Sequence, residues 1–179
     1  TELGRTQEAL DSFRDLRRRY PQSDLSESAA FLSAQLEYEL GHYAQAQAAY
    51  LDFLSLYPRS DHRAEALYGL AWSYYRLENY IGSFANFDRF ATEFPGDSLA
   101  PQAEYMAAKS LSDLGEYDMA FWRFQDFTAK HPEHPLADDA LYQIGRCLKL
   151  QGRMEEAAGE FQELIEEYPD LSLIHISEP

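Results

Sequence analysis

Residues 41–58 decide the fold, and they read GHYAQAQAAYLDFLSLYP. The small and aromatic residues that recur in this stretch at steps of three and four are Tyr43, Ala46, Tyr50, Phe53 and Tyr57. Such spacing predicts an amphipathic helix over 43–57. A glycine stands before this helix and a proline after it, and both residue types commonly separate helices.

The same pattern returns every 37 residues without an insertion. The prolines that mark it are Pro21, Pro58, Pro95, Pro132 and Pro169. Eight positions before them stand Phe13, Tyr50, Phe87, Phe124 and Phe161, and twelve positions before them stand Ala9, Ala46, Ser83, Ala120 and Ala157. With 8 prolines in 179 residues, chance does not place five of them in one register. The chain is therefore a repeat array.

Each period predicts two antiparallel helices, which we name helix A (after a proline) and helix B (before the next proline). Helix A is expected at 25–40, 62–77, 99–114 and 136–151, and helix B at 6–20, 43–57, 80–94, 117–130 and 154–168. The turn from A to B holds glycine in most repeats, which suits a left-handed residue. One repeat has Glu78 there, so we predict that Asn79 takes the left-handed conformation.

The composition excludes several classes of protein. The net charge is −16, from 31 acidic and 15 basic residues, and this opposes nucleic-acid binding through phosphate contacts. Apolar residues make up 45% and aromatic residues 15%, which is too many for a disordered acidic tail. The single cysteine, Cys147, excludes an internal disulfide. No apolar run approaches the roughly 20 residues that cross a bilayer.

The predicted helix pair resembles the tetratricopeptide repeat. The segments GHYAQA at 41–46 and GEYDMA at 115–120 match that family's turn and start of helix B, and the closing proline matches as well. A period longer than the usual 34 residues and bulky residues at Phe53, Phe90 and Phe127 make the chain similar to the bacterial cell-envelope subset. That subset includes BamD-like outer-membrane assembly lipoproteins and CpoB-like Tol-Pal coordinators. The resemblance implies an all-α solenoid of antiparallel helix pairs.

We expect a single array over residues 1–170. Its parts are a partial repeat at 1–21, with helix B only, and full repeats at 22–58, 59–95, 96–132 and 133–169. The first and last helices then lack a neighbour, so they should expose apolar faces and permit self-association. Residues 171–179 resemble a translated sequencing adapter, and we exclude this tail from the fold.

The resemblance also implies that helix A lines a concave groove that binds a partner. The residues that it places on the inner wall are Phe31, Gln35, Tyr38, Tyr68, Trp72, Tyr75, Tyr105, Lys109, Tyr142, Arg146 and Lys149. Aromatic side chains dominate the first two full repeats and cations the last two, so the groove suits a peptide with apolar and acidic residues. Two alternatives stay open. The tyrosines can serve only to pack repeats together, and the cations can serve only to pair with neighbouring acids.

No catalytic constellation emerges from the sequence. His131 and His134 are spaced as in some metal sites, but they lack a clear third ligand and fill the aromatic and capping columns of the repeat. A structural role is therefore favoured over a metal site. Cys147 lies near the small residue Gly145 and is interpreted as a buried, inert thiol. We expect no enzyme activity, no metal and no cofactor.

These observations together favour a non-enzymatic scaffold for a protein or peptide partner. The resemblance implies a location in the periplasm or at the periplasmic face of the outer membrane. A cytoplasmic regulatory adaptor and an accessory region of a larger cell-wall enzyme are the alternatives. We expect this segment to bind no nucleic acid and to insert no helix into the membrane, and a lipid anchor upstream is compatible with it.

Overall fold

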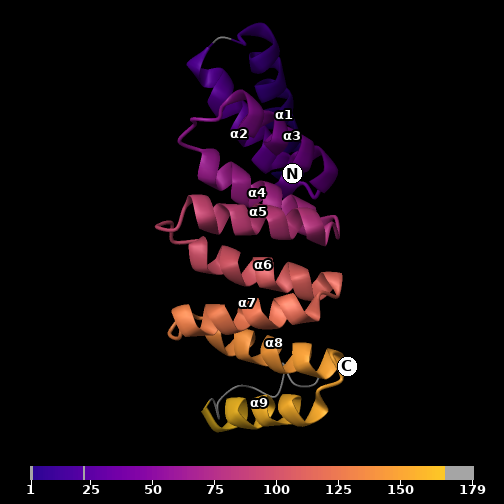
Figure 1. Cartoon of the computed structure of the whole chain (residues 1–179). Helices are drawn as coiled ribbons and strands as arrows, with labels where there is room; N and C mark the ends of the chain where they lie inside the picture. The colour runs from indigo at the N-terminus through magenta and orange to yellow at the C-terminus, as the bar shows by residue number, and fades with distance from the viewer. Residues whose placement is uncertain (1, 22, 168–179) are drawn as a thin grey trace. The chain divides into compact units, whose positions relative to one another are not determined.

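The computed structural model describes residues 2–21 and 23–167, together with the side chains of 7–21, 23 and 25–166. Over these described residues the chain forms nine helices and no strand (Figure 1). The helices are α1 (Glu2–Arg19), α2 (Asp24–Glu39), α3 (Tyr43–Leu56), α4 (Arg63–Arg76), α5 (Tyr80–Glu93), α6 (Ala100–Leu114), α7 (Tyr117–Lys130), α8 (Ala137–Leu150) and α9 (Met154–Glu167). The predicted all-α fold of helix pairs is confirmed.

The predicted boundaries agree closely with these helices. Helices α2, α4, α6 and α8 are the predicted helix A segments, and the odd-numbered helices are the predicted helix B segments. Each described boundary lies within one residue of its prediction, except that α1 begins at Glu2. The tail at 171–179 lies outside the described residues.

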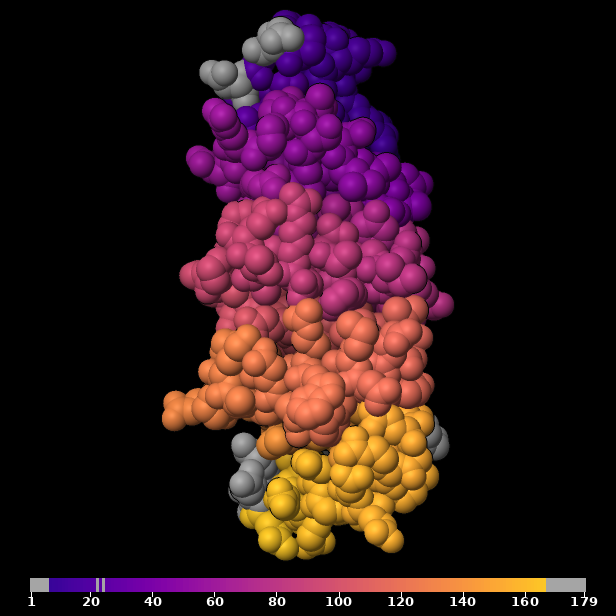
Figure 2. Space-filling model, in the orientation of Figure 1, coloured from indigo at the N-terminus to yellow at the C-terminus, as the bar shows by residue number. Residues whose placement is uncertain are grey.

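The chain divides into two compact units between Asp97 and Ser98. The first unit holds α1 to α5, and the second holds α6 to α9. Within each unit every helix packs against the helices next to it in sequence, and side chains fill the space between them (Figure 2). The buried core of each unit is therefore formed mainly by contacts between helices that are adjacent in sequence, as in other repeat proteins.

The core of the first unit is made of helix B aromatics set against small residues. Phe53, Phe87 and Phe90 have no exposed surface. Tyr50 of α3 packs so tightly on α4 that a Cβ atom at Gly69 would lie 2.5 Å from its ring. At this position an aromatic residue of helix B therefore packs into the following helix A.

The second unit repeats this arrangement in the same columns. Phe124 and Phe127 of α7 are buried, as is Ile144 of α8. Gly145 of α8 permits a close approach of α9, because a Cβ atom at Gly145 would lie 2.6 Å from the ring of Phe161.

The turns from helix A to helix B share one hydrogen-bonding pattern, and it corrects a prediction. At the end of α4, Asn79 N donates to Tyr74 O at 3.0 Å and Glu78 N donates to Tyr75 O at 2.9 Å, which is the Schellman arrangement. Glu78 itself is the left-handed residue, with φ of 57°. The prediction that Asn79 takes this conformation was therefore wrong. Asn79 has φ of −84° and caps α5 by accepting a hydrogen bond from Gly82 N. Because two bonds fix the turn, the glutamate is held in a conformation that glycine adopts more easily.

Three polar residues that follow a repeat proline by two positions accept a backbone hydrogen bond, but only Ser23 is the N-cap of its helix. Ser23 accepts from Leu25 N at 3.3 Å, and Ser60 accepts from His62 N at 3.0 Å. His134 Nδ1 accepts from the backbone N–H of Leu136 at 3.2 Å, but Leu136 is the N-cap of α8, so the expectation that His134 caps this helix was wrong.

Candidate partner-binding surface

The aromatic residues of α4 form one connected face in the first unit. Tyr68, Trp72 and Tyr75 are spaced by four and three residues, so the helix sets them on one side. The indole of Trp72 meets the ring of Tyr75 at 5.6 Å and the ring of Tyr68 at 6.3 Å, both edge to face. Phe87 of α5 lies behind it at 5.5 Å and 90°. All three predicted residues stay partly exposed, so Trp72 offers a firmly supported flat surface.

Tyr38 extends this face from α4 onto α2. Its ring packs edge to face on Tyr43 at 5.3 Å, and Arg76 donates to the Tyr43 hydroxyl at 2.6 Å. Burial raises the pKa of Tyr38, the charge of Arg76 opposes the rise, and the nearby hydroxyls of Tyr43 and Tyr68 add to it. Burial likewise raises the pKa of Tyr68. Both phenols therefore remain protonated at neutral pH and can donate hydrogen bonds.

We name this surface the aromatic face and define it as Tyr38, Tyr43, Tyr68, Trp72 and Tyr75. Sequence reasoning missed Tyr43, because the family's inward columns lie on helix A and Tyr43 begins α3. The signal that could have found it is the run of Tyr43, Tyr80 and Tyr117 at the same point of three repeats. Gln35 is also half-buried on α2.

Two of the predicted residues, Phe31 and Tyr105, are almost fully buried. Phe31 is 4% exposed, stacks on His62 at 4.5 Å and packs on Phe53 at 5.6 Å. Tyr105 is 5% exposed and packs on Phe124 at 5.5 Å. Both residues join helix A to helix B and leave little surface for a partner. At these two positions the side chain has the packing role that the sequence left open.

The cations of the second unit have unequal surroundings. Lys109 pairs with Asp113 at 3.0 Å, and Arg146 donates to the side-chain oxygen of Gln143 at 2.9 Å. Lys149 is exposed and forms no ion pair with any other described residue. Tyr142 is half-buried against Phe161, at 5.8 Å between ring centroids. Pairing with an acid therefore accounts for Lys109 and leaves Lys149 available to a ligand.

The tyrosine of α6 also reaches across to the next helix A. The Tyr105 hydroxyl donates to the Asp139 carboxylate of α8.

Six of the eleven predicted residues lie in the first unit and five in the second, and each set belongs to its own unit.

The histidines and the cysteine occupy structural positions. His131 Nε2 lies 3.3 Å from Glu104 Oε2, and its ring packs on Phe127 at 5.1 Å. Among the described residues, no three His, Cys, Asp or Glu side chains are grouped so as to hold a metal ion. Cys147 is fully buried, and that burial raises the pKa of its thiol. The interpretation of Cys147 as a buried thiol is confirmed.

Sequence reasoning also missed a buried carboxylate in the first unit. Glu37 exposes only 5% of its side chain, binds Arg14 of α1 through one oxygen, and accepts from His42 Nδ1 at 2.9 Å. The same column holds Tyr74, Leu111 and Leu148 in the later repeats. An acid in an otherwise apolar column was the available signal, because a charge in such a place needs a partner.

The comparisons with known proteins agree with this geometry. Residues 139–171 match the family model described as tetratricopeptide repeat. This matched segment includes α9 and most of α8. Residues 2–81 match a second family model, described as outer membrane lipoprotein. No curated protein sequence gives a significant match.

Solved structures share the fold at low sequence identity. MamA from Desulfovibrio magneticus RS-1 is 16% identical with a TM-score of 0.72, over 93% of this chain and 88% of that one. Kinesin light chain repeats from Podosopora anserina are 12% identical with a TM-score of 0.73, over 94% of this chain and 90% of theirs. The apo form of RapI is 17% identical with a TM-score of 0.77, over 93% of this chain and 50% of RapI. These likenesses show a tetratricopeptide-like solenoid.

Of the described helices, none combines the length and the apolar character that crossing a bilayer requires.

Proposed function

We propose that this chain is a non-enzymatic scaffold that holds a protein or peptide partner on the helix A side of its repeats. The observation that carries the proposal is the aromatic face of the first unit, where Trp72 and its tyrosines stay partly exposed although firmly packed from behind. Rigid aromatic rings give a peptide a large contact area at a small entropic cost. Gln35 adds a polar contact beside the aromatic face in the first unit. The second unit has a polar and cationic set of its own, made of Lys109, Tyr142, Arg146 and Lys149.

The match to the outer membrane lipoprotein family supports a place in the bacterial cell envelope. We propose that the chain works in the periplasm or at the periplasmic face of the outer membrane. Osmotic-shock fractionation of cells that express the full reading frame tests this location. Recovery of the protein with periplasmic or membrane markers supports the proposal, and recovery only with a cytosolic marker overturns it.

The binding surface can be tested with the two tryptophans of the chain. Trp72 lies on the aromatic face, whereas Trp122 of α7 is 67% exposed elsewhere on the second unit. We would screen an array of peptides from envelope proteins and measure the affinities of the peptides that bind. Trp72→Ala should weaken those peptides about tenfold or more, because a central aromatic anchor dominates such interfaces.

Trp122→Ala serves as the matched control, because it removes the same side chain from a different surface. Arg146→Glu should weaken only those peptides that carry acidic residues. Equal retention of every peptide by folded Trp72→Ala and Arg146→Glu variants would overturn the proposed surface.

A further inference from the structure

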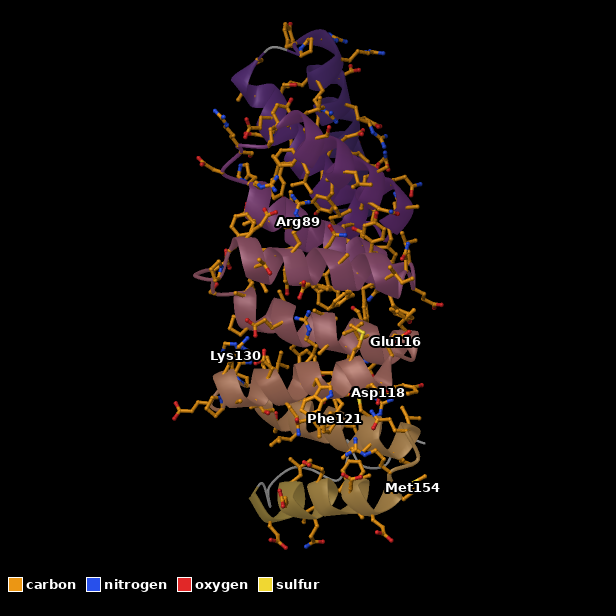
Figure 3. The ribbon with its side chains drawn as sticks, viewed as in Figure 1. Arg89, Glu116, Asp118, Phe121, Lys130 and Met154 are labelled. Carbon is orange, nitrogen blue, oxygen red and sulfur yellow. The ribbon has the colours of Figure 1, made fainter. Side chains whose placement is uncertain are left out.

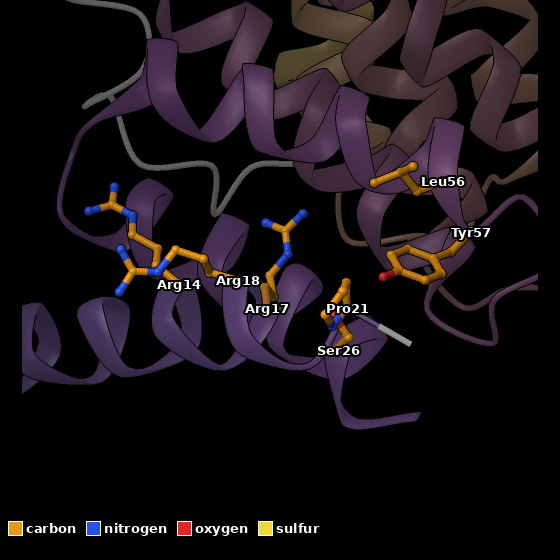
Figure 4. A pocket seen from close by; sticks show the side chains of 7 residues that line it. All are labelled: Arg14, Arg17, Arg18, Pro21, Ser26, Leu56 and Tyr57. Atoms are coloured by element: carbon orange, nitrogen blue, oxygen red, sulfur yellow. The ribbon is translucent and has the colours of Figure 1, made fainter. Parts of the chain in front are cut away.

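A cleft in the first unit is lined by three arginines of α1. Arg14, Arg17 and Arg18 stand along one side, and Leu56 and Tyr57 at the end of α3 stand along the other (Figure 4). Pro21 also lines the cleft, whose volume is about 510 Å³. It is formed by the end of α1, the start of α2 and the end of α3, so it uses none of the residues of the aromatic face.

The charge of this cleft is opposite to that of the chain as a whole. The net charge is −16 with only 15 basic residues, yet the last turn of α1 alone carries Arg17, Arg18 and Arg19. A guanidinium group presents several N–H donors in a plane and matches a carboxylate in bidentate fashion. A concentration of arginines in one cleft of an acidic protein therefore favours a small anionic group as ligand.

The three arginines divide into two that are held and one that is available. Arg14 binds the buried Glu37, and Arg18 binds Asp15 at 2.8 Å. Arg17 is half-buried and forms no hydrogen bond or ion pair with a described residue. Its guanidinium is thus the group in the cleft that can pair with an incoming carboxylate without breaking an existing ion pair.

The opposite wall of the cleft is apolar and fixed. Leu56 is 61% exposed, and the ring of Tyr57 is held by packing on Phe53 at 5.4 Å. The Tyr57 backbone N–H donates to Phe53 O at 2.8 Å, which fixes the end of α3. An apolar side chain next to a carboxylate could therefore cover Leu56 and Tyr57 while the carboxylate meets Arg17.

We propose that this cleft binds an acidic segment of a partner protein, in which an Asp or Glu carboxylate pairs with Arg17 and a neighbouring apolar side chain packs on Leu56 and Tyr57. Arg14 and Arg18 add positive potential but keep their own acidic partners. Nucleic acid is disfavoured because a long polyanion would meet the negative charge of the rest of the chain. The site is separate from the aromatic face, so either proposal can fail without the other.

The test uses fluorescence anisotropy with a labelled peptide that contains Glu-Phe-Glu. Arg17→Glu should weaken its binding about tenfold or more, because a charge-assisted pair is replaced by repulsion. Arg19→Glu is the matched control, since Arg19 lies in the same turn but does not line the cleft. It should change the affinity by about twofold or less, as expected for an exposed charge that lies outside the cleft and is screened by salt.

Further arms separate the ligand sources and the two proposals. A Gln-Phe-Gln peptide should not bind, and Trp72→Ala should leave Glu-Phe-Glu binding unchanged. Equal losses in Arg17→Glu and Arg19→Glu would overturn the proposal, because only the general field of α1 would then be at work. It would also be overturned if Gln-Phe-Gln bound as tightly, or if phosphatidylglycerol vesicles bound through Arg17 while the acidic peptide did not. Circular dichroism checks that both variants remain helical.

Discussion

The two units place different chemistry in identical columns of one repeat. Where the first unit has Gln35 and Trp72, the second has Lys109 and Arg146. The buried columns do not diverge in this way, because Phe90 and Phe127 occupy the same position with 0% and 1% exposure. The difference teaches that stability depends on a few packed columns, and that the half-exposed columns of helix A are free to carry separate binding properties in each unit.

The largest effect is expected in the buried aromatic column. Phe90→Ala in the first unit and Phe127→Ala in the second should each lower the free energy of unfolding by about 3–5 kcal/mol, because each leaves a cavity in a closed core. Urea denaturation followed by circular dichroism measures the loss. The exposed Leu51, changed to Ala, is the control and should cost much less. A small loss in only one unit would show that the column is not equivalent in the two.

A smaller effect is expected where a small residue permits close packing. Ala108 of α6 is fully buried, so Ala108→Leu should lower the free energy of unfolding by about 1–3 kcal/mol through overpacking. Ala71→Leu makes the equivalent change in the first unit, where Ala71 is equally buried. Ala129→Leu at an exposed position of α7 is the control. An unchanged melting temperature for Ala108→Leu would contradict the role of this column.

Opposite signs are expected at the turns of the two units. Glu78→Gly in the first unit should raise the free energy of unfolding by about 1 kcal/mol, because glycine takes the left-handed conformation without a Cβ penalty. Gly115→Ala in the second unit, where φ is 92°, should lower it by about 1 kcal/mol for the same reason. Glu116→Gly controls for the loss of an acid beside a turn, and it should not stabilise. Urea denaturation of the three variants measures these changes in the free energy of unfolding.

The smallest effect is expected at an ion pair that both units form between the same two columns, with the positions of the acid and the base exchanged. Lys130, which is labelled in Figure 3, fills the column of Glu93. Its Nζ atom lies 2.6 Å from the Asp126 carboxylate and 3.9 Å from the Glu104 carboxylate. Burial alone would raise the pKa of Glu93, but hydrogen bonds from Arg89 and Arg63 outweigh it and lower that pKa.

A carboxylate with a lowered pKa stabilises the fold above its unfolded pKa, and that stability is lost as the pH falls through its folded pKa. Arg63→Gln should therefore raise the pKa of Glu93 towards its ordinary value and cost about 0.5 kcal/mol or less at neutral pH. Carboxyl NMR titration measures the shift. Arg59→Gln, at an exposed neighbouring position, should leave the pKa of Glu93 as it was. A shift of the same size in both variants would point to a general charge effect.

Most of the fold could be predicted because the same residue pattern occurs in several repeats, and each repeat predicts the helix boundaries independently. Four copies of the turn and five of helix B fixed the helix boundaries nearly to the residue. The left-handed conformation of Glu78 was not predicted, because asparagine adopts that conformation more readily than glutamate does. In the structure the two hydrogen bonds of the turn determine which position is left-handed, and Glu78 occupies that position.

The binding surfaces were less accessible to sequence reasoning. Phe31 and Tyr105 lie in the predicted groove row, but packing against helix B takes up their surface, and column position alone does not reveal depth. The arginine-lined cleft combines α1 with the ends of two other elements, so no single column contains it. The Glu37 pair with Arg14 was hidden for the same reason, since its partners come from different elements.

The packing of each helix on its neighbours in sequence has a kinetic consequence. Chains whose contacts are mostly local have low contact order and fold within about microseconds to milliseconds, since little loop entropy is lost before contacts form. Within either unit, a helix emerging from the ribosome meets its packing partner after one short turn. Folding can therefore keep pace with synthesis, which proceeds at about 5–20 residues per second, and the aromatic side chains spend little time open to aggregation.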